Sequence, residues 1–117
     1  MNNIDGDAMT LEVTLKKNDE TPILELTGRI IDIDVKKFQR RIEQLYKKKY
    51  PKIIVDVSRA NFIDSHGLGT IVYYHTLMQK EKRQLIILNS NNEKTSYLNR
   101  LFELTNLDKV LTIVEKI

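Results

Sequence analysis

The fold is decided by the stretch Ile53-Ile54-Val55-Asp56-Val57-Ser58-Arg59-Ala60-Asn61-Phe62-Ile63-Asp64-Ser65-His66-Gly67-Leu68-Gly69. Its β-branched run at 53–57 predicts a buried strand, the polar residues 58–61 predict a loop, and a helix is expected from about Ser65 to Lys82. Ser65 thus stands at a predicted helix start, where unpaired N–H groups and the helix dipole favour an anion. Its hydroxyl is either a plain helix cap or a site that tolerates phosphate, and both interpretations stay open at this point.

The chain before this stretch predicts a hairpin. Residues 11–16 alternate between apolar and polar, and a second strand follows at Ile23–Thr27 after a turn. Gly28 is expected to end that strand. Residues 1–9 are polar and small, and we expect them to be disordered.

Helices and strands alternate in the remainder of the chain. Asp34 is the predicted N-cap of a helix that ends before Pro51. Apolar residues recur at helical spacing in this segment, namely Val35, Phe38, Ile42, Leu45 and Tyr46. Further along we expect a strand at 84–88, a helix at 96–102 and a final strand at 110–114. The stripe of the helix after Ser65 is predicted to comprise Leu68, Ile71, Val72, His75 and Met78.

This order of elements predicts the fold class. The expected order is strand, strand, helix, strand, helix, strand, helix, strand. After the hairpin, such alternation favours parallel neighbours with helices packed on the sheet. We therefore expect an α/β fold: one domain over residues 10–117 with a mixed central sheet and an N-terminal hairpin.

The composition excludes several classes of protein. No cysteine is present, so disulfides, cysteine-based zinc sites and thiol catalysis are excluded. No apolar run approaches the ~18 residues that a membrane helix needs. The first residues lack the pattern of a signal peptide, and we expect a cytoplasmic protein that does not contact a membrane.

Eight basic residues gather between positions 36 and 52, while the net charge of the whole chain is only +3. A solvated helix face, a surface for an acidic partner and a nucleic-acid surface are the three interpretations. Interleaved aromatics and a helix-turn-helix pattern are missing, which disfavours direct nucleic-acid binding. The eight residues are Lys36, Lys37, Arg40, Arg41, Lys47, Lys48, Lys49 and Lys52.

Enzymatic chemistry finds little support in the sequence. Ser65 and His66 are adjacent, and side chains adjacent at a helix start diverge, so they make a poor nucleophile and base. His75 lies nearly three helical turns further on and is expected to be a packed, hydrogen-bonded core residue. The segment also lacks the first glycine of the nucleophile-elbow motif.

Metal and nucleotide sites are the other chemical candidates. Asp56, Asp64 and His66 resemble a hydrolytic metal site only loosely, if they converge. Gly67-Leu68-Gly69 lacks the spacing of both the P-loop and the dinucleotide fingerprint. The two glycines either let the helix pack close to the sheet or leave room for a partner. We therefore expect no metal, no cofactor and no enzymatic activity.

The segment Ile63-Asp64-Ser65-His66-Gly67-Leu68-Gly69 resembles the signature of the STAS domain family, specifically of bacterial anti-sigma factor antagonists. Leu24–Gly28 resembles the family's second strand and the glycine after it. Ile53–Ser58 resembles its central strand, and Asn99–Leu107 its last helix and short exit. The resemblance covers roughly residues 10–117.

The resemblance implies a switchable binding protein. The serine after the aspartate is phosphorylated in the family by a serine kinase that is also an anti-sigma factor, and a metal-dependent phosphatase removes the phosphate. The unphosphorylated form binds the kinase and frees the sigma factor. Carried over, Ser65 is the phosphoacceptor, while ATP and magnesium belong to the kinase. The implied partner-binding residues are Asp32, Asp64, Ser65, His66, Gly67 and Gly69.

Two positions depart from the family pattern and support a different hypothesis. His66 stands where a small hydroxyl residue is common, and Arg29 follows Gly28 where many members carry an acid. The chain is then a STAS module that binds without phosphorylation, in a stress-signalling or transport assembly. A small enzyme or nucleotide-binding protein is the third hypothesis, and a weak homodimer is a further one.

Overall fold

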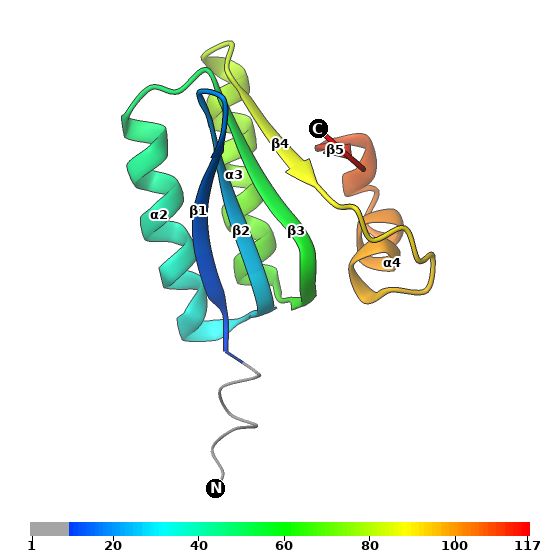
Figure 1. The fold of residues 1–117 in the computed structure, drawn as a ribbon. Helices are drawn as coiled ribbons and strands as arrows, with labels where there is room; N and C mark the ends of the chain where they lie inside the picture. The colour runs from blue at the N-terminus through cyan, green and yellow to red at the C-terminus, as the bar shows by residue number, and fades with distance from the viewer. Residues whose placement is uncertain (1–9) are drawn as a thin grey trace, which may run out of the picture.

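The sheet contains five strands in the order β1-β2-β3-β4-β5 (Figure 1). The computed structural model describes residues 10–117, so the disorder expected for residues 1–9 falls outside the described part. β1 runs antiparallel to β2, and all other neighbours are parallel. This confirms the mixed sheet with its N-terminal hairpin. The strands are β1 (Glu12–Asn18), β2 (Thr21–Ile30), β3 (Lys52–Ile63), β4 (Gln84–Leu88) and β5 (Thr112–Val114).

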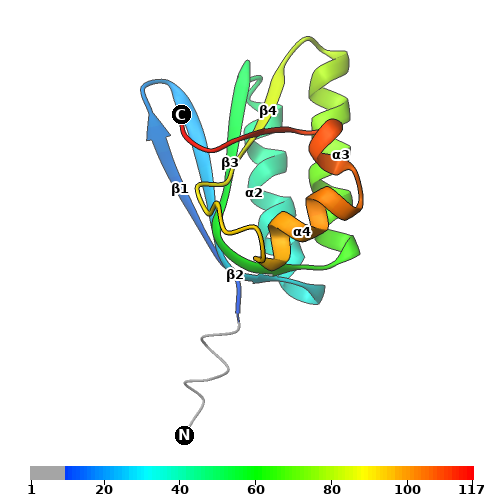
Figure 2. The same cartoon turned by 90° about the vertical axis from the view of Figure 1, so that its right-hand side faces the viewer.

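Two long helices cover one face of the sheet. They are α2 (Val35–Lys47) and α3 (Ser65–Lys80), and they lie side by side (Figure 2). The shorter α4 (Tyr97–Leu104) packs beside β3, and the 3-10 turns η1 (Asp32–Asp34) and η2 (Leu107–Lys109) complete the connections. Within residues 10–117, no helix has the length and apolar character needed to cross a membrane.

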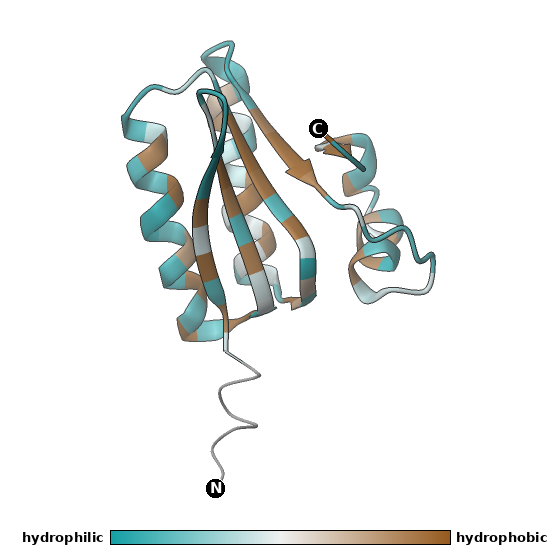
Figure 3. Cartoon of the chain, in the orientation of Figure 1, coloured by the Kyte–Doolittle hydropathy of each residue, from teal (hydrophilic) through white to brown (hydrophobic). Residues whose placement is uncertain are grey.

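The core lies between the sheet and its helices. Along β2 every second residue is buried, and Leu24, Leu26 and Ile30 are completely buried. The predicted stripe of α2 faces them, with Val35, Phe38, Ile42 and Leu45 buried and Tyr46 half-buried. Figure 3 shows these apolar bands along the strands and the inner sides of the helices.

The loop predicted at residues 58–61 is wrong, because β3 continues through it to Ile63. β2 likewise continues past Gly28, which was expected to end it, and its last residues pair with this second half of β3 across two register shifts. Gly28 has φ +102°, and the carbonyl oxygen of Thr10 would lie 2.5 Å from any Cβ there. Only glycine fits this position, so the residue shapes the strand without ending it.

Asp34 stands at the N-cap position of α2, as predicted, but its side chain does not cap the helix. Its backbone is already helical, since the chain turns through η1 first, and its side chain makes no capping hydrogen bond. Its carboxylate lies instead 3.6 Å from Nζ of Lys37. The other expected boundaries lie within two residues of the observed ones, and the strand expected at 84–88 is observed with those bounds.

The buried sector of α3 is rotated from the predicted stripe. Ile71, His75 and Met78 are buried as expected, but Leu68 and Val72 are only half-buried, and Thr70 and Tyr74 are buried instead. The reason is that α3 packs against the sheet on one side and against α2 on another. The burial of His75 is confirmed, whereas the structure gives no hydrogen bond to its side chain among residues 10–117.

Arg83 closes the end of the sheet where α2 and α3 finish. Its guanidinium donates to the carbonyl oxygens of Tyr50 at 2.8 Å and Tyr46 at 2.9 Å. It also lies 2.8 Å from a carboxylate oxygen of Glu81 and 4.7 Å from the centroid of the Tyr46 ring. Its side chain is only 9% exposed, so these contacts are shielded from water.

We expect Arg83→Ala to lower the free energy of unfolding by about 2–3 kcal/mol, because it removes charge-assisted hydrogen bonds to two carbonyl groups. Arg83→Lys should recover part of the loss, since it keeps the charge but not the planar fork. Urea denaturation gives both values. The matched control is Arg40→Ala, an exposed arginine on α2. Equal losses in Arg83→Ala and Arg40→Ala would contradict this account.

Candidate functional site

The site is built where β3 ends and α3 begins. Asp64 is extended, and one carboxylate oxygen accepts the N–H of Gly67 at 2.9 Å, which makes Asp64 the N-cap. The possibility that Ser65 is the cap is therefore wrong. Ser65 is the first helical residue, and its hydroxyl is not needed to start the helix.

Asp64 also ties α3 to the connection between β2 and α2. Its second carboxylate oxygen accepts the N–H of Asp32 at 2.9 Å. Asp32 has φ 56°, a left-handed conformation that aspartate adopts more readily than most residues. The N–H of Asp64 donates to the carbonyl oxygen of Ile30 at 3.1 Å. One residue therefore fixes the loop and the helix start relative to each other.

The pKa of Asp64 is lowered despite partial burial. Burial by itself raises the pKa, but the hydrogen bonds from Gly67 and Asp32, with a further one from His66, outweigh it. The carboxylate therefore stays ionised in the folded protein at neutral pH. A fixed negative charge thus lies directly beside the Ser65 hydroxyl.

Ser65 is exposed, and its hydroxyl has no hydrogen-bond partner within residues 10–117. A side chain at the first helical position lies near the positive end of the helix dipole, where the Asp64 carboxylate already accepts the N–H of Gly67. A phosphate attached there would lie near the positive end of the helix dipole and next to the ionised Asp64, so it would add to the negative charge at this surface. The hydroxyl is thus accessible at the surface and does not help to hold the start of α3 in place.

The two glycines of the motif have different roles, one for each interpretation given above. Gly67 is buried, and a Cβ there would lie 2.8 Å from side-chain carbons of both Ile30 and Ile63. Gly67 thus lets α3 pack onto the strand ends. Gly69 is exposed, and a Cβ there would have no atom within 4 Å. Its missing side chain leaves open space at the surface.

A groove runs from Ser65 along the junction of α2 and α3. Its volume is 370 Å³, and His66, Gly69 and Tyr73 line the α3 side. On the α2 side, Gln39 donates a hydrogen bond to the Thr70 hydroxyl at 3.0 Å and so links the two helices. The groove is therefore a shallow surface feature with a fixed base.

Most of the predicted site residues lie at one end of the molecule. Asp32, Asp64, Ser65 and His66 surround the start of α3, with Gly69 one turn further. Gln39 and Tyr73 also line the groove and were not predicted from the sequence. Tyr73 is 58% exposed whereas Tyr74 is 8% exposed, a difference that only the packed structure shows; the sequence itself offers only the spacing of one turn between Gly69 and Tyr73.

The metal site that Asp56, Asp64 and His66 would form is not present in the described residues. Asp56 lies within β3 and accepts the backbone N–H of Ser58, while Asp64 caps α3. Across residues 10–117, no group of three or more acidic or histidine side chains is arranged to hold a metal ion.

A family model for the STAS domain matches residues 12–117, and the chain belongs to this family. Its fold is similar to that of a candidate anti-sigma factor antagonist from Thermotoga maritima, at 28% identity and a TM-score of 0.72, over 90% of this chain and 87% of that one. It is also similar to SpoIIAA in its unphosphorylated form, at 20% identity and a TM-score of 0.69, over 88% of each chain.

The phosphorylated form of SpoIIAA, described as a Bacillus cell fate determinant, gives a TM-score of 0.64 at 20% identity. That match covers 88% of this chain and 91% of the other. At this identity the likeness to SpoIIAA shows the fold alone. The family membership and the mixed sheet with packed helices are confirmed.

We expect Asp64→Asn to lower the free energy of unfolding at pH 7 by about 1 kcal/mol, because one of the two N–H acceptors is lost. The folded pKa of Asp64 is lowered, so its contribution is present above the unfolded pKa of about 3.9 and is lost as the pH falls through the folded value. Urea denaturation from pH 7 to pH 2.5 should show the two proteins converging. A constant difference over that range would exclude this role.

Gly67→Ala and Gly69→Ala form a matched pair on one helix. Gly67→Ala should destabilise the fold by about 1–3 kcal/mol, because the new methyl group overlaps Ile30 and Ile63. Gly69→Ala should stabilise it by about 0.5–1 kcal/mol, because alanine favours helix and meets open space. Thermal denaturation measures both, and shifts of the same sign would contradict the assigned roles.

Proposed function

We propose that this chain is an anti-sigma factor antagonist, a regulatory binding protein and not an enzyme. In its unphosphorylated form it binds a serine kinase that is also an anti-sigma factor, and this releases the sigma factor. Phosphorylation of Ser65 ends the binding, and a metal-dependent phosphatase restores it. The observation that carries the proposal is the exposed Ser65 hydroxyl, unbonded within residues 10–117, at the start of α3.

The charge change explains how such a switch works without refolding. A phosphate adds about −1.5 to −2 charge at neutral pH, beside the ionised Asp64. A partner surface that fits a neutral serine then buries repelling charges, which costs several kcal/mol. Each ~1.4 kcal/mol weakens binding tenfold, so this repulsion is sufficient.

The neighbouring residues take supporting roles in this proposal. Asp32, His66 and Gly69 are exposed around Ser65 and contact the partner, while Asp64 orients the helix start beneath them. Gly67 is buried and acts by holding α3 against the strand ends. ATP and magnesium are supplied by the kinase.

Incubation with ATP and the anti-sigma factor kinase of the source organism should add one phosphate to the wild type and none to Ser65→Ala. Ser90→Ala is the matched control, since Ser90 is also exposed, and it should be phosphorylated like the wild type. Intact mass and peptide mapping by mass spectrometry give the number and position of phosphates.

Binding of the same kinase provides the second measurement. Ser65→Asp should bind at least tenfold more weakly than the wild type. Phosphate on another residue would refute the assignment of Ser65. Unchanged binding of Ser65→Asp would favour the alternative, a STAS module that binds without phosphorylation.

A further inference from the structure

Helix α2 carries several basic side chains that form no ion pair with another described residue. It contains five lysine or arginine residues and one glutamate. Lys37 is paired with Asp34, and Lys47 with Glu43. Lys36 and Arg40 are exposed, and within residues 10–117 neither lies in an ion pair.

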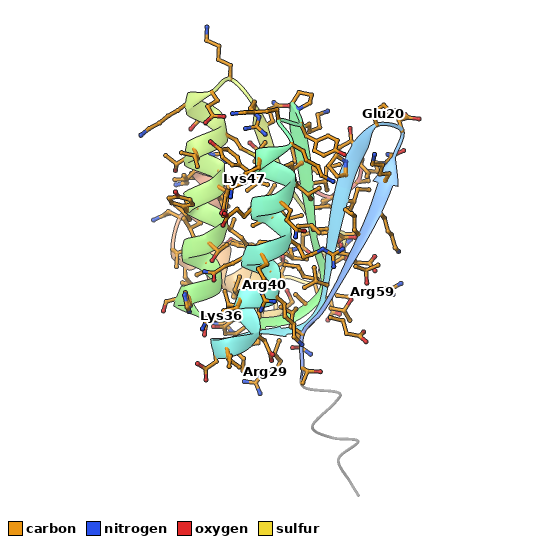
Figure 4. All side chains as sticks on the ribbon, turned by 90° about the vertical axis from the view of Figure 1, so that its left-hand side faces the viewer. Glu20, Arg29, Lys36, Arg40, Lys47 and Arg59 are labelled. Carbon is orange, nitrogen blue, oxygen red and sulfur yellow. The ribbon has the colours of Figure 1, made fainter. Side chains whose placement is uncertain are left out.

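Lys36 and Arg40 lie on α2 next to the residues that line the groove beside Ser65. The hydrogen bond from Gln39 to Thr70 fixes which side of α2 adjoins α3. Lys36, Arg40 and Glu43 are spaced by four and three residues along α2, so the two basic side chains lie on the same side of the helix as Glu43, which lines the groove. Figure 4 shows them on the outward side of α2, with Lys36 toward the end where α3 begins.

The base of the groove suits an apolar side chain. No atom lies within 4 Å of the position where Gly69 would carry a Cβ. Tyr73 stands one turn further along α3 at 58% exposure, and its ring packs edge-on against Tyr74 with centroids 5.0 Å apart. The aromatic wall is therefore fixed in position before a partner arrives, which lowers the entropy cost of binding.

We propose that the groove between α2 and α3 is the docking site for an acidic segment of the partner kinase, with one apolar side chain seated over Gly69 against Tyr73. Lys36 and Arg40 pair with carboxylates of that segment, and the Gln39–Thr70 bond holds the groove open. This inference rests on the proposed function and names the chemistry of the partner surface.

The distribution of charge favours an acidic peptide over a nucleic acid. Glu43 lines the groove, and Asp32 and Asp64 lie at its Ser65 end. A phosphate backbone, charged at every nucleotide, would meet these carboxylates, whereas a peptide can place its acids opposite Lys36 and Arg40 alone. An acidic segment also agrees with the proposal that phosphorylation ends the binding, because a phosphate on Ser65 would repel the segment's carboxylates.

The test measures binding of the kinase that phosphorylates Ser65, with ADP present so that no phosphate is transferred. The double variant Lys36→Glu/Arg40→Glu should bind at least tenfold more weakly, mainly through a lower association rate, and wild-type association should slow as salt is added. Lys48→Glu/Lys52→Glu makes the same change of charge at the other end of the molecule and should bind like the wild type.

Gly69→Leu separates docking from folding. The leucine fills the hollow, so binding should weaken at least tenfold, while the melting temperature stays equal or rises because leucine favours helix. A melting temperature that falls in step with affinity would overturn the role of the hollow.

The outcomes distinguish the two proposals. If the kinase phosphorylates Ser65 but binds all three variants like the wild type, the groove is not the docking site and the proposed function stands. If it neither binds nor phosphorylates the wild type, both proposals fail. Binding of a fluorescent oligonucleotide that Lys36→Glu/Arg40→Glu abolishes, with kinase binding unchanged, would assign the groove to nucleic acid.

Discussion

The carboxylate of Asp64 is the contact on which the rest of the site depends. One oxygen caps α3 through Gly67, and the other holds the backbone of Asp32 in its left-handed turn. Because both acceptors are on one planar group, the loop before α2 and the start of α3 cannot move independently. The position of the exposed Ser65 hydroxyl is therefore set by the hydrogen bonds from the Asp64 carboxylate to backbone N–H groups, and not by the surrounding surface side chains.

Much of the fold follows from the sequence, because burial alternates in simple patterns. Apolar residues recur at every second position along β2 and at helical spacing along α2, and both patterns are visible in the sequence. The apolar run Ile53–Val57 likewise marks a buried strand. The second half of β3 was missed because Ser58–Asn61 is polar. Within this stretch Arg59 and Ala60 pair with Thr27 and Gly28 of β2. The polar side chains of Arg59 and Asn61 are exposed, so their polarity reports exposure and not the end of a strand.

The site was predictable in part for similar reasons. The motif from Asp64 to Gly69 places an acid, a hydroxyl and two glycines at a helix start, and local helix geometry then determines where they lie. The division of labour between Gly67 and Gly69 was not predictable, since it depends on where Ile30 and Ile63 lie in the packed structure. The link from Gln39 to Thr70 likewise joins residues 31 positions apart, beyond the reach of local patterns.

The cap at Asp64 has a consequence for the proposed phosphorylation of Ser65. One of its hydrogen-bond donors comes from 32 residues earlier in the sequence, so the complete cap requires the ends of β2 and β3 to lie side by side. Helix α3, with two glycines in its first turns, has little tendency to form alone. A newly made or damaged chain therefore offers Ser65 in a disordered segment without the helix dipole beside it. Under the proposed function, a kinase that recognises Ser65 in its helical setting acts only on the folded protein.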